Sequence, residues 1–339
     1  MKEIEVEKAV GTVLAHDLTQ IIPGKYKGPK FKKGHVIREE DIPLLLSMGK
    51  KHLYVVEKDD TDVHEDDAAM RIAIAASGPG VTLVAPGEGK VEIIAAYDGL
   101  LKVNTELLAR LIDQDEIMFA SIHENRLVKA GDKLAGTRVI PLFVNEAIVK
   151  GAEAVCQEGV LIQVKPLKAM KVGVVTTGSE VYSGKIKDAF GPVLVRKFGE
   201  LGSHVVKQLF ADDDEDMIAD CIKTLIEDGV DIVGVTGGMS VDPDDKTPSG
   251  IRKAGGHIVT YGAPVLPGAM FMLAYIGDIP VVGLPGCVMY SRASVFDLIV
   301  PRILAGEVPS RGEIKKLAHG GLCLNCEVCT FPNCGFGRT

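Results

Sequence analysis

Apolar runs of strand length alternate with amphipathic stretches of helix length between residues 168 and 308. In residues 215–228 the apolar side chains, among them Ile218 and Ile222, recur at the spacing of one helix face. Strands that alternate with helices in this way predict right-handed crossovers and a mainly parallel sheet. We therefore expect an α/β domain of three layers here. The expected strands are 172–175, 204–209, 232–235 and 281–284, and the expected helices are 192–201, 215–228 and 290–305.

The first half of the chain has a different pattern. Residues 1–66 contain helical spacing at 39–48, a stop at Gly49 and a strand-like run at 53–56, which predicts a small α/β segment. An acidic stretch, 57–67, follows. Apolar and polar residues then alternate in several short runs, with helical spacing only near 68–76 and 105–112. We expect 67–167 to be a β-rich accessory domain.

Composition and charge narrow the class of protein. The chain has 339 residues, 46% of them hydrophobic, and a formal net charge of -8. An acidic chain lacks the basic footprint of a nucleic-acid-binding protein, although backbone N–H groups still bind phosphate. The first ten residues have no apolar signal core, and no apolar run is long enough to span a bilayer. We expect a cytoplasmic protein with no nucleic-acid or membrane partner.

Acidic and glycine-rich segments follow the expected strands. They are Thr177–Glu180, Asp212–Asp214 and Gly237–Asp245, with Pro285-Gly286 after the last strand. In open α/β sheets, ligands bind at the carboxyl ends of the strands. Carboxylates gathered there need a cation, and Mg²⁺ binds a few carboxylates together with water and phosphate oxygens. Asp214, directly before a helix, is instead expected to be an N-cap.

These segments occur in a specific order: Thr177-Gly178-Ser179-Glu180, Ile186-Lys187-Asp188, Gly202, Asp213-Asp214, Gly237-Gly238-Met239-Ser240-Val241 through Asp245, Pro267-Gly268, and Leu284-Pro285-Gly286. In that order they resemble the molybdopterin-binding domain of the molybdopterin molybdotransferases and molybdopterin adenylyltransferases, over about 170–306. Residues 9–17 and the turn Pro23-Gly24 also resemble the N-terminal region of the molybdotransferases.

The resemblance implies insertion of molybdate into adenylated molybdopterin, with Mg²⁺-dependent release of AMP, by a homodimer. It assigns Glu180, Asp188, Asp213 and Asp245 to the catalytic site, with Asp213 and Asp245 as Mg²⁺ ligands. The residues that it assigns to the pterin and its phosphate are Thr177, Gly178, Ser179, Gly237, Gly238, Ser240, Pro267, Gly268, Pro285 and Gly286.

The chain departs from the family at several positions. Leu266 and Ala269 stand where the family commonly has lysine, and Cys287 stands where it has asparagine. The Ser-Ala-Met-Asp-Gly motif of the family's N-terminal half is missing from this sequence. These departures favour an alternative, in which the protein is a non-enzymatic carrier of molybdopterin, or a loading chaperone, that docks a molybdoenzyme or another cofactor-biosynthesis protein. A third hypothesis is a nucleotide hydrolase, because related domains occur in nicotinamide-nucleotide pyrophosphatases.

Four of the seven cysteines lie in the tail, 309–339. Cys323, Cys326, Cys329 and Cys334 are spaced C-x₂-C-x₂-C-x₄-C. Thiols at this spacing in a chain without an export signal favour metal binding over disulfides. Zn²⁺ takes four thiolates in a tetrahedron, and iron–sulfur clusters take a similar run of cysteines. The tail is therefore predicted to bind either Zn²⁺ or an iron–sulfur cluster, and it is the predicted docking element of the carrier hypothesis.

Overall fold

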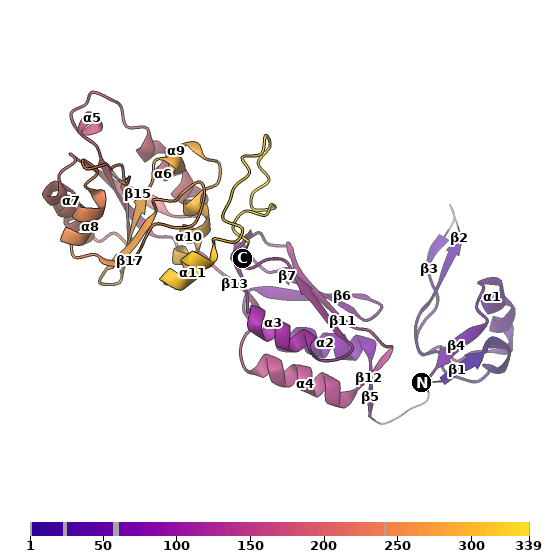
Figure 1. Cartoon of the computed structure of the whole chain (residues 1–339). Helices are drawn as coiled ribbons and strands as arrows, with labels where there is room; N and C mark the ends of the chain where they lie inside the picture. Colours follow the sequence, from indigo (N-terminus) through magenta and orange to yellow (C-terminus); the bar gives the residue numbers. More distant parts are fainter. Residues whose placement is uncertain (1, 23–25, 57–60, 241, 339) are drawn as a thin grey trace. The chain divides into compact units, whose positions relative to one another are not determined.

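A computed structural model describes residues 2–22, 26–56, 61–240 and 242–338. The turn Pro23-Gly24, the start of the acidic stretch (57–60) and Val241 lie outside the described residues. The chain divides into two compact units, which are described separately (Figure 1). Unit 1 comprises residues 1–97, 102–122 and 129–164, and unit 2 comprises 98–101, 123–128 and 165–339.

The N-terminal part of unit 1 has its own small core, which contains Leu14, Phe31, Ile37, Leu45 and Leu53. The helical spacing predicted at 39–48 is confirmed by η2 and α1, and the predicted strand is β4. Strand β1 pairs antiparallel with β4, and β2 with β3. The elements are β1 (Lys2–Glu5), η1 (Val6–Lys8), β2 (Leu18–Ile22), β3 (Tyr26–Phe31), η2 (Glu39–Asp41), α1 (Ile42–Ser47) and β4 (His52–Val55).

The rest of unit 1 is built on an antiparallel sheet in the order β6-β7-β11-β9. The helices predicted near 68–76 and 105–112 are confirmed as α2 and α3. A third helix, α4, was not predicted, although Val149, Ala152, Val155 and Cys156 are buried at helical spacing along it. The elements are β5 (Asp62–His64), α2 (Glu65–Ala76), β6 (Val81–Gly87), β7 (Lys90–Ala95), α3 (Thr105–Ile112), β9 (Ile117–Ser121), β11 (Lys133–Val139), β12 (Phe143–Asn145) and α4 (Glu146–Gln157). Three further short strands fall in this stretch of sequence. They are β13 (Ile162–Lys165), β8 (Gly99–Val103), of which residues 99–101 belong to unit 2, and β10 (Leu127–Val128), which belongs to unit 2.

Unit 2 contains a six-stranded sheet in the order β15-β14-β16-β19-β18-β17. The four predicted strands are confirmed, and they are mutually parallel. Strands β17 and β18 were not predicted, and they pair antiparallel with each other. Strand β18 is also antiparallel to β19, because it turns directly into β19 through Gly277-Asp278. The strands are β14 (Lys171–Thr177), β15 (His204–Ala211), β16 (Ile232–Thr236), β17 (His257–Tyr261), β18 (Met272–Ile276) and β19 (Ile279–Leu284).

Helices cover both faces of this sheet, which confirms the three-layer α/β fold. On one face, Val172 and Val174 share a hydrophobic core with residues of α6 and α10. On the other face, Val175 and Val233 share a core with residues of α7 and α8. The helices are α5 (Ser179–Tyr182), α6 (Phe190–Glu200), α7 (Glu215–Glu227), α8 (Thr247–Lys253), α9 (Cys287–Tyr290), α10 (Val295–Leu304) and α11 (Arg311–Lys316). Among the described helices, none combines the length and apolar composition needed to cross a bilayer.

The predicted helix at 290–305 is wrong in its first turn. Helix α9 ends at Tyr290, and α10 begins only at Val295. Ser294 starts α10 because its backbone N–H donates to the Asp297 carboxylate at 2.7 Å in a capping box. The prediction at Asp214 is confirmed, since its carboxylate accepts the Met217 N–H at 2.9 Å and caps α7.

The cysteine-containing tail packs as part of unit 2. Ile314, Leu317 and Phe336 are buried in the same core cluster as Val172. The backbone of Leu266 accepts a hydrogen bond from the Cys323 N–H and donates one to Gly321, both at 2.8 Å. The tail is therefore fixed to the loop that follows Val265.

A buried ion pair joins α6 to α10. The Lys197 ammonium lies 2.8 Å and 3.0 Å from the two Asp297 carboxylate oxygens, and Lys197 is 5% exposed. Lys197→Met keeps the apolar stem but leaves Asp297 without its partner, so we expect it to lower the free energy of unfolding by about 3 kcal/mol. The control Lys207→Met breaks the exposed pair with Asp228, which should cost about 0–1 kcal/mol. Urea unfolding measures both variants, and equal losses would contradict this interpretation.

The carboxylate of Glu313 gives unit 2 a pH-dependent stability. Partial burial works to raise the pKa of Glu313, but hydrogen bonds from Ser310 and the ion pair with Arg302 outweigh it and lower the pKa to about 2. A carboxylate with a lowered pKa stabilises the fold above its usual pKa of 4.5, and this contribution is lost as the pH falls toward 2. The free energy of unfolding should thus differ most between Glu313→Gln and the wild type above pH 4.5. A difference that grew toward low pH would argue against this assignment.

Candidate functional site

The turns that follow β14, β15, β16 and β19 lie at one edge of the unit 2 sheet. These four strands are parallel, with Thr176 opposite both Phe210 and Thr236, and Thr236 opposite Leu284. Their carboxyl ends therefore meet at the same edge, where open α/β sheets bind ligands. The residues predicted for the catalytic and pterin sites lie at or after these strand ends, or in the loop that contains Pro267.

A cavity of about 520 Å³ opens at this edge. Three segments line it: residues 237–240 together with Asp245, residues 266–270, and residues 285–287. The structure thus gathers eight predicted residues around one space, namely Gly237, Gly238, Ser240, Asp245, Pro267, Gly268, Pro285 and Gly286. It adds lining residues that were not assigned to the site, namely Met239, Leu266, Ala269, Met270 and Cys287.

The Gly237-Gly238 turn is packed directly against the end of β14. Gly237 has a φ of +84°, and a Cβ there would lie 2.4 Å from the Thr177 carbonyl oxygen. Gly238 has a φ of +49°, and a Cβ there would lie 3.0 Å from the Thr247 hydroxyl. The hydroxyls of Thr177 and Thr247 are 3.1 Å apart and buried. Only glycine satisfies both the backbone conformation and the available space at Gly237.

Ser179 joins the first acidic loop to the second. Its backbone N–H donates to the Asp213 carboxylate at 2.9 Å, and its hydroxyl donates to Asp212. The bond from the Ser179 hydroxyl, followed by one from the Asp213 N–H, lowers the pKa of Asp212 below its usual range. Ser179 and Asp213 are therefore brought together, but neither they nor Gly178 are among the residues that line the cavity.

Asp188 has a structural role at the start of α6. Its carboxylate accepts the N–H groups of Phe190 and Gly191 at 2.9 Å and 3.1 Å. The Gln208 side-chain amide donates to the same carboxylate at 2.7 Å. The catalytic role of Asp188 stays a prediction, as does that of Glu180, which is exposed on α5.

Asp245 is the acidic residue that faces the cavity. Its N–H donates to the Asp242 carbonyl at 3.0 Å, which closes the turn before α8. Tyr261, at the end of the unpredicted strand β17, donates its hydroxyl to the Met239 carbonyl at 3.0 Å and so holds the glycine turn from the other side. Burial, and then the nearby Asp245 charge, raise the pKa of Tyr261.

The carboxylates and thiols predicted as metal ligands are not gathered into a metal site in the part of the chain that the structure describes. No group of three or more His, Cys, Asp or Glu side chains is close enough there to hold a metal ion. Asp213 and Asp245 as Mg²⁺ ligands, and the four tail cysteines as metal ligands, accordingly stay predictions.

Comparison with known proteins identifies the class of domain. Residues 173–305 match a family model described as "Probable molybdopterin binding domain". This match confirms the resemblance inferred from the sequence for about 170–306. Residues 3–57 match a second model, described as a "Domain of unknown function".

Individual relatives are similar over parts of the chain. A "CinA-like protein" from Syntrophus aciditrophicus (strain SB) is 34% identical over 26% of this chain and 20% of its own length. A "Molybdopterin molybdenumtransferase" from Staphylococcus aureus (strain MSSA476) is 29% identical over 49% of this chain and 41% of its own length. The chain thus spans less than half the length of these two relatives. A solved structure of a "molybdopterin biosynthesis moea protein from Pyrococcus horikosii" is 17% identical over 93% of this chain and 76% of its own, with a TM-score of 0.34.

The packing at Gly237 predicts a position-specific response to a single methyl group. Gly237→Ala forces both a left-handed alanine and a contact with the Thr177 carbonyl, so the turn has to shift. Gly229→Ala is the matched control, because Gly229 has a φ of +78° and nothing within 4 Å of its Cβ position. The control should lose about 1–2 kcal/mol of unfolding free energy, and Gly237→Ala should lose clearly more. Equal losses in chemical denaturation would contradict the close packing of the turn.

Proposed function

We propose that the cavity lined by residues 237–240, 266–270 and 285–287 binds molybdopterin or its adenylate, and that the protein inserts molybdate with Mg²⁺-dependent release of AMP. The observation that carries this proposal is the convergence of eight residues of the molybdopterin-binding pattern on one cavity. The family match over 173–305 and the similarity to a molybdopterin molybdenumtransferase support it.

The cavity suits a pterin ligand that carries a phosphate. Its volume of about 520 Å³ falls within the range of about 300–1,000 Å³ that is usual for small-molecule sites. Gly237 and Gly238 line the cavity without side chains, so their backbone forms its wall, and Ser240 is exposed beside them. Met239, Leu266 and Met270 add apolar wall for the flat ring system.

The charge of the cavity wall fits a bound cation. Asp245 is the one charged side chain among the described residues that line the cavity. Mg²⁺ is typically held by one or two carboxylates, with water and phosphate oxygens completing its shell, so Asp245 is a suitable ligand. Bound Mg²⁺ would neutralise phosphate charge and polarise a phosphoryl oxygen. The hydrogen bonds from Ser179 orient the Asp213 carboxylate, which is a second candidate ligand.

Two further features belong to the proposal. The homodimer follows from the family resemblance, and the two units described above would each be present twice. The metal predicted for the tail, Zn²⁺ or an iron–sulfur cluster, is not a participant in the proposed reaction.

The carrier hypothesis is favoured by one observation. No basic side chain occurs among the described residues that line the cavity, and Leu266 and Ala269 stand in two places where lysine is common in the family. A site with less positive charge stabilises a developing negative charge less well, while apolar and backbone contacts still hold the pterin. In this alternative the protein binds molybdopterin and delivers it without cleaving the adenylate.

The proposed reaction is tested by incubating the full chain with adenylated molybdopterin, molybdate and Mg²⁺ and measuring AMP. We expect AMP release that EDTA abolishes. Asp245→Asn should slow it by roughly 100-fold, the effect expected for losing a few kcal/mol of charge stabilisation. Asp244→Asn, in the same turn but exposed and not lining the cavity, should react like the wild type.

The other outcomes separate the alternatives. Tight molybdopterin binding without AMP release would contradict the transferase and support the carrier. Turnover of free dinucleotides would point to the hydrolase. Absence of pterin binding would overturn both the transferase and the carrier.

A further inference from the structure

One wall of the candidate pterin cavity is a loop. It consists of residues 266–270, which lie between β17 and β18 and belong to neither strand. Its first residue, Leu266, lines the cavity and is 56% exposed. The Pro267 carbonyl accepts the Val295 N–H at 3.1 Å, so α10 holds the middle of the loop. The position of Leu266 depends on the other contacts of its backbone.

The cysteine-containing tail makes those contacts. The Leu266 N–H donates to the Gly321 carbonyl, and the Leu266 carbonyl accepts the Cys323 N–H, both at 2.8 Å. The two bonds form a parallel bridge between Leu266 and Leu322. Both backbone groups of Leu266 are therefore bonded to the tail, which lies outside residues 173–305, the part that matches the molybdopterin-binding model.

The tail reaches this position through a narrow passage at Gly321. A Cβ at Gly321 would lie 2.3 Å from the carbonyl oxygens of both Leu317 and Pro264, and real Cβ atoms do not approach backbone so closely. Two residues of the tail close its base, since the Gly337 N–H donates to the Gly320 carbonyl at 2.9 Å. The absence of a side chain at Gly321 thus lets a closed tail lie directly against the loop that leads to the cavity wall.

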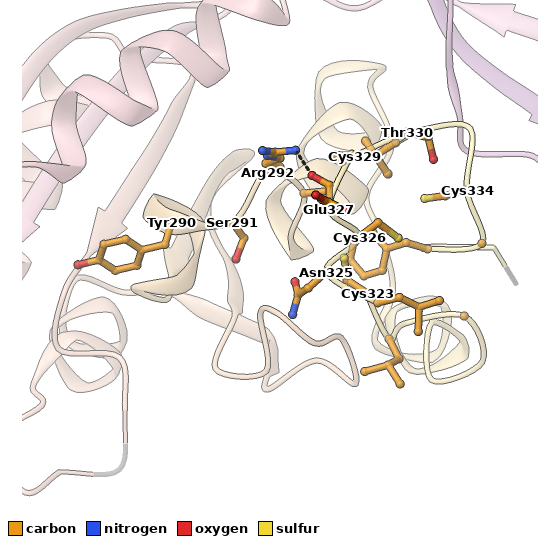
Figure 2. Close-up of a pocket in the computed structure, with 17 residues that line it drawn as sticks. Tyr290, Ser291, Arg292, Cys323, Asn325, Cys326, Glu327, Cys329, Thr330 and Cys334 are labelled. Carbon is orange, nitrogen blue, oxygen red and sulfur yellow. Dashed lines mark hydrogen bonds between the residues drawn. The ribbon is translucent and has the colours of Figure 1, made fainter.

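The tail also contacts the segment that follows α9. Together with residues 290–293 it surrounds a second cavity of about 550 Å³ (Figure 2). The Arg292 guanidinium donates to the Glu327 carbonyl of the tail at 3.3 Å, the contact drawn in Figure 2. Helix α9 leads back from there to Cys287, which lines the candidate pterin cavity. The tail is therefore bonded to segments next to two of the three walls of that cavity.

We propose that the tail is part of the pterin site, and that Gly321 is a positioning residue that acts through Leu266. The inference rests on the proposed binding of molybdopterin, but not on the release of AMP. A wall that is already in place does not have to be ordered when the ligand binds, which lowers the entropic cost of binding. The wall contacts the ligand before and during the reaction alike, so its displacement should weaken binding without slowing the chemical step.

The test measures the Kd for molybdopterin with the full chain, from the fluorescence of the pterin. Gly321→Ala pushes the tail away from Leu266, and we expect it to raise the Kd by about 10-fold because the wall then has to be ordered on binding. Gly335→Ala makes the same substitution in the tail where nothing lies within 4 Å of the Cβ position, and it should keep the wild-type Kd. If AMP is released, KM should rise in Gly321→Ala by the same factor while kcat stays unchanged.

Gly229→Ala separates positioning from stability. This variant is expected to destabilise unit 2 at a site outside the tail and the candidate cavity, so its Kd should equal that of the wild type. A Kd that rises equally in Gly229→Ala and Gly321→Ala would overturn the inference, because general destabilisation would then explain both. Equal Kd values in Gly321→Ala and Gly335→Ala would overturn it as well, and would leave the pterin site itself standing.

A second pair of variants covers the case in which Gly321→Ala does not fold. Cys323→Pro removes the N–H that donates to Leu266, whereas Cys323→Ala keeps it. The inference predicts weaker molybdopterin binding by Cys323→Pro than by Cys323→Ala, and equal binding would contradict it. A wild type that binds no molybdopterin at all would overturn the proposed function, and this inference with it.

Discussion

The contact between the Gly237-Gly238 turn and the end of β14 is the constraint on which the candidate site depends. Strands β14 and β16 are parallel and in register up to Thr176 and Thr236, so their following residues meet immediately. The turn fits because Gly237 has no side chain that would collide with the Thr177 carbonyl. The hydroxyl of Thr247, from α8, lies against Gly238 and within hydrogen-bond distance of the Thr177 hydroxyl. With the turn held in this way, Ser240 and Asp245 come to line the same cavity as the two Pro-Gly turns.

Charge is arranged around this turn in two separate groups. Asp212 and Asp213 are engaged by Ser179, which binds the loop after β15 to the loop after β14. Asp245 stands apart from them and carries negative charge at the cavity wall. A phosphate-bearing ligand in such a cavity needs a cation to offset both charges, which is why Mg²⁺ is part of the proposal. The tail is connected to the same region through the backbone of Leu266.

Much of unit 2 was predictable because its central strands are continuous apolar runs and its helices carry clear stripes. The turn residues of the site were predictable for a related reason, since glycine and proline at strand ends are distinctive in sequence. Strands β17 and β18 were missed because antiparallel pairing through the short Gly277-Asp278 turn breaks the βα rhythm. Helix α4 was missed because small residues such as Ala152 give a weak stripe.

Other features depend on contacts between distant segments, which no local pattern reveals. The Thr247 N–H donates to the Gly238 carbonyl and the Tyr261 hydroxyl donates to the Met239 carbonyl, yet these residues come from α8 and β17 and carry no motif of their own. The contacts of the predicted acidic residues are likewise visible only in the fold. Asp188 accepts a hydrogen bond from the Phe190 N–H at the start of α6, and Asp213 accepts one from the Ser179 N–H.

The most direct test of the central claim is a crystal structure of the full chain with adenylated molybdopterin and Mg²⁺. The account predicts that the pterin lies between the turns at Gly237, Pro267 and Pro285, with its phosphate next to Gly238 and Ser240. A ligand bound beside Ser179 and Asp213, with the cavity left empty, would contradict it.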